Sequence, residues 1–362
     1  MNRLVMMLAF MLILPGTALG TQWIVYESTS GPGQGKHIVL ISGDEEYRSE
    51  EALPLLAKIL ATHHGFRCTV LFAVDPTTGT IDPNNRNHIP GLKALESADL
   101  MVIFTRFRDL TDEQMQYIDN YLQSGNPVIG IRTSTHAFLP ETGSKWAHYA
   151  NGYDGKKEAW KDGFGRLVLG EKWISHHGRH RHQSTRGIIA PGAKSHPITR
   201  GLKDVDIWGP TDVYGVRLPL PDDAHPLVLG QVVNRSGEYD PQDKLFGMRS
   251  TDDDIAGEHS GPEGRGNLND PMMPIAWTKT YRLPGGKVGK AFSSTIGAST
   301  DLLSQGTRRL LVNAVYWATG LEKEIPPNGA KVQLVGEYRP TGYGFRKGNY
   351  WLNRGLQVSD LR

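Results

Sequence analysis

The chain has 362 residues and a formal net charge of +2, with acidic and basic side chains interspersed along its length. A chain of this length can bury a large core, and the even distribution of charge argues against nucleic-acid binding, which needs clustered Lys and Arg. The 42 glycines and 22 prolines predict long, ordered loops on a regular scaffold.

The N-terminus has the pattern of a signal peptide. Arg3 precedes an apolar run from Leu4 to Leu14, and the small residues Ala18 and Gly20 offer a cleavage site near Gly20. A retained anchor is the alternative, although the run is short for a membrane span. We expect residues 1–20 to be removed on export to the periplasm or the medium, leaving no stable membrane span in the mature chain.

Apolar runs alternate with helical patterns after residue 36. Residues 21–36 are rich in Ser, Thr, Gly and Pro and are expected to form an exposed leader. The expected elements are a strand at 37–43, a helix ending near 64, a strand at 66–74, a short helix at 92–95, a strand at 98–105, a helix from 111 to 122 and a strand at 128–131. Repeated strand–helix–strand units predict an α/β fold with a doubly wound, mostly parallel, flavodoxin-like sheet.

The pattern loosens after residue 136, where long irregular insertions are expected. Short apolar stretches at 166–169, 187–190 and 226–230 are predicted as added strands, and 275–278 with 287–294 as a late hairpin. An amphipathic helix at 306–321 ends the domain, which therefore covers 37–321. The Pro- and Gly-rich residues 322–362 are expected to form an extended tail on the surface. The single cysteine, Cys68, lies in a predicted strand and is interpreted as a small core residue.

Polar side chains follow two of the predicted strands directly. Asp44 and Glu46 follow the first strand, and Arg132, Ser134 and His136 follow the strand at 128–131. The carboxyl ends of parallel strands share one edge of a sheet, so these groups are expected to form a site. Asp44 and Glu46 are candidate acid/base catalysts, or alternatively complement the dipole of the next helix. Arg132 and Ser134 would bind the oxygens of a ligand, and His136 would be a general base.

A histidine-rich segment at residues 176–182 is the second candidate site. His177, His180 and His182 are candidate ligands of a divalent metal such as zinc, and His180 and His182 would share one face of a strand. The interleaved arginines disfavour a dication, so a polar loop with local hydrogen bonds is the alternative. Asp212 and Tyr214 would lie on one face of an extended segment and are predicted to bind substrate.

Several stretches together resemble the ThuA-like (trehalose utilisation) family, which has a class I glutamine amidotransferase-like fold. They are residues 39–47, 124–132, 195–202 with 211–214, and 289–297 with 308–317. Amidotransferases of this fold carry a nucleophilic cysteine after the strand that corresponds to 128–131, and this chain has Arg132 there. A guanidinium is not a nucleophile, so glutaminase chemistry by that route is excluded. The resemblance implies a substrate among oxidised (keto) disaccharides and glycosides.

Three functions are compatible with these observations. The first is an exported enzyme that processes a keto-sugar or disaccharide by acid/base elimination, hydration or cleavage. The second is a non-catalytic carbohydrate-binding or scaffold protein on an amidotransferase-like fold that has lost its thiol. The third is a metal-dependent hydrolase. In each case the expected partner is a small-molecule carbohydrate, and a homo-oligomer is compatible with the sequence.

Overall fold

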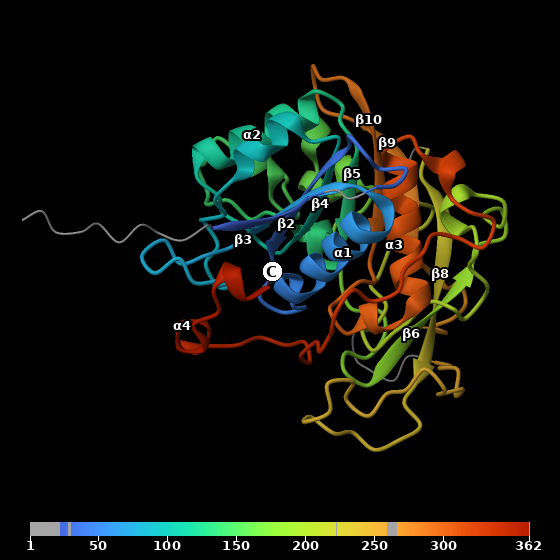
Figure 1. Cartoon of the computed structure of the whole chain (residues 1–362). Coiled ribbons are helices and arrows are strands. Elements are labelled where there is room, and N and C mark those ends of the chain that lie inside the picture. Colours follow the sequence, from blue (N-terminus) through green and yellow to red (C-terminus); the bar gives the residue numbers. More distant parts are fainter. Residues whose placement is uncertain (1–21, 28–29, 222, 259–265, 362) are drawn as a thin grey trace, which may run out of the picture.

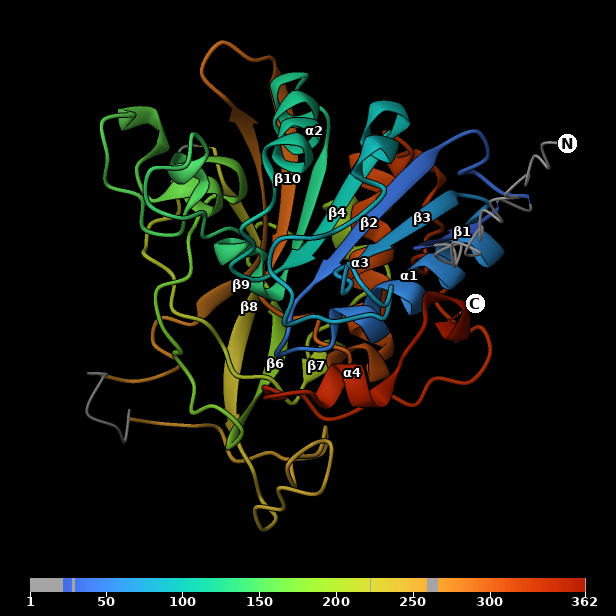
Figure 2. The same cartoon turned by 90° about the vertical axis from the view of Figure 1, so that its left-hand side faces the viewer.

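A ten-stranded sheet organises the chain in the computed structural model, which describes residues 22–27, 30–221, 223–258 and 266–361 (Figures 1 and 2). Its strands follow the order β1-β3-β2-β4-β5-β10-β9-β8-β6-β7. They are β1 (Trp23–Tyr26), β2 (His37–Gly43), β3 (Arg67–Phe72), β4 (Leu100–Thr105), β5 (Val128–Ile131), β6 (Gln183–Ile189), β7 (Trp208–Gly209), β8 (His225–Asn234), β9 (Met273–Arg282) and β10 (Val288–Ser294). The α-helices are α1 (Ser49–His64), α2 (Asp112–Gln123), α3 (Gln305–Ala318) and α4 (Tyr350–Arg354).

The predicted parallel strands form one half of this sheet. Strands β3, β2, β4, β5 and β10 are parallel neighbours, so the predicted α/β fold is confirmed. The other half is antiparallel: β10 and β9 form the expected hairpin, and β8, β6 and β7 extend it. The sheet is therefore mixed. The carboxyl ends of β2, β4, β5 and β10 all lie at one edge.

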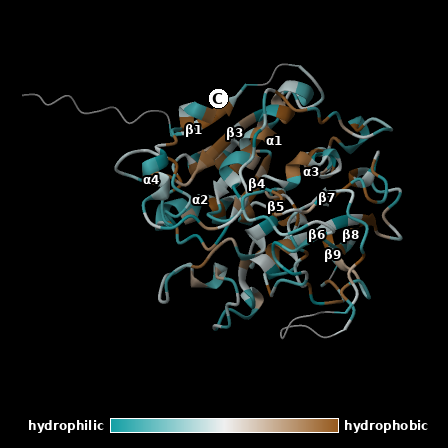
Figure 3. Cartoon of the chain, turned by 90° about the horizontal axis from the view of Figure 1, so that it is seen from below, coloured by the Kyte–Doolittle hydropathy of each residue, from teal (hydrophilic) through white to brown (hydrophobic). Residues whose placement is uncertain are grey.

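Helices cover both faces of the parallel half. Within β2, Ile38 and Leu40 pack in the core shared with α1 and α3, whereas Val39 and Ile41 pack in the core shared with α2. This division follows from the strand period, because successive side chains point to opposite faces. Hydrophobic segments accordingly concentrate in the sheet and around α1 and α3, while the peripheral loops are largely hydrophilic (Figure 3). Cys68 is buried in the first of these cores, as predicted.

Two predicted segments have a different structure. The expected exposed leader contains β1, which pairs antiparallel with β3 and extends the sheet. The run at 166–169, predicted as a strand, is a π-helical turn at Gly165–Leu169. A short apolar run does not distinguish a strand from a buried helical turn. Here the Leu169 carbonyl accepts hydrogen bonds from the Trp277 indole at 2.6 Å and the Ser293 hydroxyl at 2.8 Å, which dock the turn on the sheet.

The C-terminal tail, expected to lie extended on the surface, contributes to the core. Tyr343, Trp351 and Val358 are buried, and α4 forms within the tail. One anchor is His64 at the end of α1, whose Nε2 lies 2.7 Å from the Lys331 carbonyl and whose Nδ1 lies 2.8 Å from the Tyr316 hydroxyl. The carbonyl can only accept, so Nε2 carries a proton and donates to it.

The predicted signal peptide, residues 1–20, lies outside the described residues. Among the residues that are described, no helix is long and apolar enough to cross a membrane.

The His64 anchor predicts a loss of stability in mild acid. Burial lowers the pKa of His64 from 6.5 to about 4, so the unfolded chain binds a proton that the folded chain does not. Stability that is present above pH 6.5 is therefore lost as the pH falls toward 4, by about 2 kcal/mol between pH 7 and 5. Urea unfolding at both pH values should show a smaller loss in His64→Gln than in the native protein. The half-buried neighbour provides the control, His63→Gln, which should keep the native pH dependence. An unchanged pH dependence in His64→Gln would contradict the assignment.

Candidate functional site

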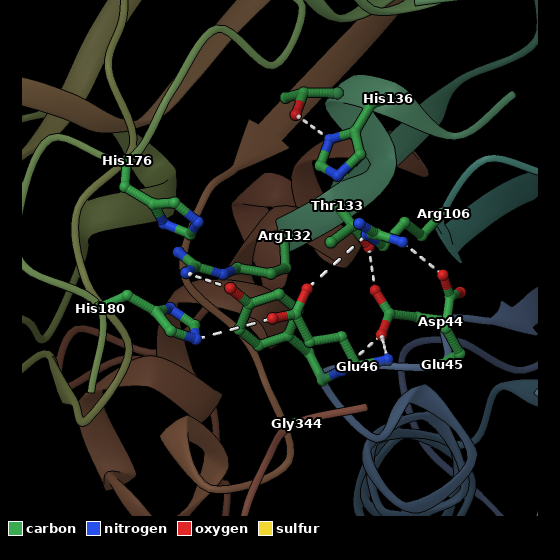
Figure 4. A network of polar contacts seen from close by, with 12 residues as sticks. Asp44, Glu45, Glu46, Arg106, Arg132, Thr133, His136, His176, His180 and Gly344 are labelled. Atoms are coloured by element: carbon green, nitrogen blue, oxygen red, sulfur yellow. Dashed lines mark hydrogen bonds and ion pairs between the residues drawn. The ribbon is translucent and has the colours of Figure 1, made fainter. Parts of the chain in front are cut away.

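The strand ends at the shared edge carry a continuous network of charged side chains (Figure 4). Asp44, Glu45 and Glu46 follow β2, and Arg106 follows β4. Arg132 follows β5 and begins a short 3-10 helix, Arg132–His136. This arrangement agrees with the prediction that the carboxyl ends of these strands bring polar side chains together. The remaining members of the network come from the insertion between β5 and β9 and from the C-terminal tail.

Arg132 occupies a strained elbow between β5 and the 3-10 helix. Its φ is 47°, in the left-handed region that L-residues other than Gly rarely adopt. Ser134 supports the turn: its hydroxyl oxygen lies 2.5 Å from the Ile103 carbonyl and 2.8 Å from the Ile131 carbonyl, and its side chain is fully buried. Ser134, predicted to bind substrate, is therefore engaged inside the sheet edge and does not face a ligand.

The Arg132 guanidinium is fully buried and holds three segments together. Nη1 donates to the carbonyls of Asp212 at 2.8 Å and Thr295 at 2.6 Å, and Nη2 donates to Asp212 Oδ1 at 3.1 Å. Its Cζ lies 3.8 Å from the centre of the Tyr214 ring and 4.5 Å from that of Tyr47. Arg132 and Tyr214 are both buried, so their predicted substrate-binding roles do not fit. Arg132 positions Asp212 instead.

Asp212 connects this buried cation to two histidines. Oδ2 accepts a hydrogen bond from His176 Nδ1 at 2.7 Å, and Oδ1 accepts one from His180 Nδ1 at 3.0 Å. Burial alone would raise the pKa of Asp212, but these two bonds and the charge of Arg132 hold it well below its usual range. The carboxylate therefore stays ionised and accepts from both Nδ1 atoms, which directs Nε2 of each imidazole away from Asp212.

The pKa values of the two imidazoles shift in opposite directions. Burial lowers the pKa of both, but for His176 the hydrogen bond and charge of Asp212 outweigh burial and raise its pKa. For His180, burial and the neighbouring cations prevail and its pKa is lowered. His176 is the more exposed of the two, with a side-chain exposure of 38% against 25%.

Glu46 faces His180 across the network. Its Oε1 lies 3.6 Å from His180 Nε2 and its Oε2 lies 3.7 Å from Arg106 Nε. Burial, reinforced by the negative charge of Asp44, raises the pKa of Glu46 to about 7 despite the opposing charge of Arg106. Glu46 is thus placed beside a group with which it could exchange a proton, and its acid/base role stays a prediction.

The contacts of Asp44 do not fit the acid/base role that was predicted for it. Its Oδ1 accepts the backbone N–H of Glu46 at 2.6 Å and that of Tyr47, and its Oδ2 accepts the Thr133 hydroxyl. With both oxygens occupied and the side chain fully buried, Asp44 orients the loop after β2 and has no free oxygen for a substrate. It is a positioning residue for Glu46.

His136 borders the same network but lies among aromatic rings. Its ring centroid is 4.9 Å from that of Phe107, 5.5 Å from Trp173 and 6.3 Å from Tyr214. Burial, then the charge of Arg106, lowers the pKa of His136 well below its ordinary value, so the imidazole is neutral. The side chain is 3% exposed, which limits its access to a substrate.

Only one of the three predicted metal ligands joins this network. His177 Nε2 contacts the Leu268 carbonyl at 2.8 Å, and His182 stacks on Tyr239 with ring centroids 4.9 Å apart. His180 is the exception, and its partner is His176. Among the described residues, His176, His180 and Asp212 form a group whose candidate ligand atoms lie within 4.8 Å of one another. His176 and His180 are thus the imidazoles that could hold a metal.

Several members of the site were missed in the sequence. Arg106 directly follows β4 and could have been found by the same strand-end argument as Asp44. Tyr343 and Gly344 in the tail gave no signal, because nothing local relates them to the sheet. Tyr343 stacks on Tyr47 at 5.2 Å, and the Gly344 N–H donates to the Glu46 carbonyl at 2.7 Å.

The comparisons with known proteins agree with this architecture. The sequence model of the ThuA family, described as trehalose utilisation, matches residues 38–318. The chain belongs to the ThuA family. The predicted resemblance and the amidotransferase-like fold are thereby confirmed, and Arg132 at the elbow distinguishes this ThuA-like chain from a glutamine amidotransferase. A search of curated proteins gives no match.

Solved structures resemble this ThuA-like chain at low sequence identity. A protein from Bacteroides uniformis described as ThuA-like is 13% identical with a TM-score of 0.47, covering 81% of this chain and 95% of its own. One from Parabacteroides merdae, described in the same words, is 17% identical with a TM-score of 0.41, covering 86% and 97%. A cytoplasmic protein from Salmonella typhimurium is 12% identical with a TM-score of 0.37, covering 77% and 98%.

The buried Arg132–Asp212 pair predicts a large loss of stability when one partner is removed. Both side chains are fully inaccessible, so Asp212→Asn leaves a buried guanidinium without its counter-charge. We expect a loss of about 3–5 kcal/mol in the free energy of unfolding, measured by urea denaturation. The control is Glu337→Gln, which breaks the exposed pair with Arg339 and should leave the midpoint unchanged. Equal midpoints for Asp212→Asn and the native protein would contradict the role of the pair.

Proposed function

We propose that this chain is an exported enzyme of carbohydrate metabolism that processes a keto-sugar or a disaccharide by acid/base chemistry. One observation carries the proposal. His176 and His180 are held through Nδ1 by a buried carboxylate, and Glu46 stands 3.6 Å from His180 Nε2. Three groups capable of proton transfer therefore meet at the strand-end edge, where open α/β sheets bind ligands. Membership of a family named for trehalose utilisation favours a sugar as the ligand.

The chemistry of a keto-sugar suits these groups. A carbonyl acidifies the neighbouring C–H bond, so a base such as Glu46 can take that proton and leave an enolate. Collapse of the enolate breaks the C–O bond at the next carbon, and an imidazolium such as that of His176 gives its proton to the departing oxygen. Proton transfer is balanced, and no oxidant is required. In this assignment Asp44 positions Glu46, and the Arg132–Asp212 pair positions the two histidines.

A non-catalytic carbohydrate-binding protein is the second candidate. It is favoured by Arg132, which stands where the amidotransferases to which the fold is similar carry their nucleophile. The network around Glu46 argues against it, because a binding site has no need for a carboxyl group raised toward neutral pKa beside two imidazoles.

Product analysis separates the two candidates. The purified mature chain is incubated with native and 3-keto disaccharides, and products are followed by mass spectrometry. Glu46→Gln and His176→Ala, which remove the proposed base and acid, should each lower kcat by about 10²–10⁴-fold on the substrate that is turned over. His182→Ala changes an imidazole of the same loop that stacks on Tyr239, and it should retain native turnover. Binding of a sugar without turnover of any member of the panel would favour the binding protein.

Export is the other part of the proposal, and it has its own test. The supporting pattern is Arg3 followed by the apolar run Leu4 to Leu14 and by Gly20. Full-length protein expressed in a Gram-negative host should be recovered from the periplasm or the medium with a new N-terminus next to Gly20. Recovery of the intact chain from the cytoplasm would refute export and leave the proposed chemistry unaffected.

A further inference from the structure

We propose that His176, His180 and Glu46 bind a divalent transition-metal ion of the zinc class, through Nε2 of each imidazole and a carboxylate oxygen. The inference deepens the proposed function and places a metal at the same site. It rests on the orientation of the two rings. Both turn Nδ1 to Asp212, at 2.7 and 3.0 Å, and their centroids lie 4.8 Å apart. The two Nε2 atoms are thus the nitrogens left for a ligand.

Asp212 has the features of a group that supports metal ligands. Histidine ligands of metals almost always donate their other ring N–H to a carboxylate or carbonyl, which fixes the tautomer and the ring orientation. Asp212 does this for both imidazoles at once and is itself held by Arg132 at 3.1 Å. Its oxygens already accept these three donors, and its side chain is fully buried. We therefore infer that Asp212 supports the two histidine ligands without touching the metal, and that Glu46 coordinates the metal.

Glu46 is the carboxylate available for the third ligand. Its contacts with His180 and Arg106, at 3.6 and 3.7 Å, are longer than hydrogen bonds. Arg106 instead directs Nη1 to Glu45, to which Arg108 also donates at 2.7 Å. The carboxylate of Glu46 thus faces the imidazoles without a tight partner of its own.

The local charge also accommodates a cation. Four carboxylates, those of Asp44, Glu45, Glu46 and Asp212, lie in the network with three guanidinium groups, those of Arg106, Arg108 and Arg132. With both imidazoles neutral, the network has one net negative charge. Two imidazoles and one carboxylate, with positions left open, form a ligand set typical of catalytic zinc and related ions.

A bound ion would polarise a substrate carbonyl, which Arg132 cannot do. The guanidinium of Arg132 is buried and directed at protein oxygens, so it is unavailable to polarise a substrate carbonyl. A metal held by His176, His180 and Glu46 would supply that polarisation as a Lewis acid. The metal-bound and metal-free forms therefore differ in a measurable way.

The test is metal binding by the mature chain. Chelator-treated protein is titrated with Zn²⁺ by calorimetry, and the retained ion is measured by mass spectrometry after gel filtration. About one Zn²⁺ per chain should be retained. His176→Ala, His180→Ala and Glu46→Gln should each weaken binding by at least tenfold, and Asp212→Asn by about 10–100-fold, with circular dichroism verifying the fold of every variant.

The same loop provides matched controls. His177→Ala and His182→Ala remove imidazoles that contact the Leu268 carbonyl and Tyr239, and both should bind Zn²⁺ as the native protein does. The inference fails if the native chain retains no ion, or if His182→Ala loses as much affinity as His180→Ala. It also fails if metal-free protein turns over a keto-sugar at the full rate, an outcome that would leave the proposed function intact. Stoichiometric binding at these residues without turnover would support the metal site and refute the proposed function.

Discussion

The buried ion pair between Arg132 and Asp212 is the constraint on which the site depends. Taking a guanidinium and a carboxylate out of water costs several kcal/mol per ion, and their attraction offsets this only when further hydrogen bonds satisfy the remaining donors and acceptors. The chain supplies them from distant segments: the Thr295 carbonyl after β10, the Asp212 backbone, and two imidazoles. The pair therefore ties the antiparallel insertion to the carboxyl ends of the parallel strands.

The elbow that carries Arg132 retains a strained backbone without the nucleophile that such elbows present in amidotransferases. A left-handed φ costs about 1–3 kcal/mol and persists only when its surroundings enforce it. Here Ser134 bonds back to the strand ends, and the guanidinium is clamped between the rings of Tyr47 and Tyr214. In this chain the elbow directs the Arg132 guanidinium into the protein interior, where its hydrogen bonds orient Asp212.

The parallel half of the fold and part of the candidate site could be predicted from the sequence. Strand and helix periods between 37 and 131 are strong signals, and the strand-end rule located Asp44, Glu46 and Arg132. It could not assign their roles, because whether an arginine clamps a ligand or a buried aspartate depends on residues 80 positions away. The run at 166–169 was predicted wrongly, since four apolar residues fit either a strand or a helical turn. The contribution of Gly344 depends on long-range packing with no local pattern.

The histidine segment at 176–182 shows most clearly what a local sequence pattern could not predict, namely which imidazoles lie together. Alternation on an extended strand favours His180 with His182, but Arg181 has a φ of 62° and breaks that geometry immediately before β6 begins. The turn instead brings His180 beside His176, which precedes it by four residues in the sequence. Both imidazoles face the carboxylate of Asp212. In the proposed function, acid/base chemistry therefore lies with imidazoles from the segment between β5 and β6, and not on the elbow after β5. The buried Arg132 supports that arrangement, because its charge keeps the Asp212 carboxylate ionised, and an ionised carboxylate accepts the Nδ1–H of both histidines.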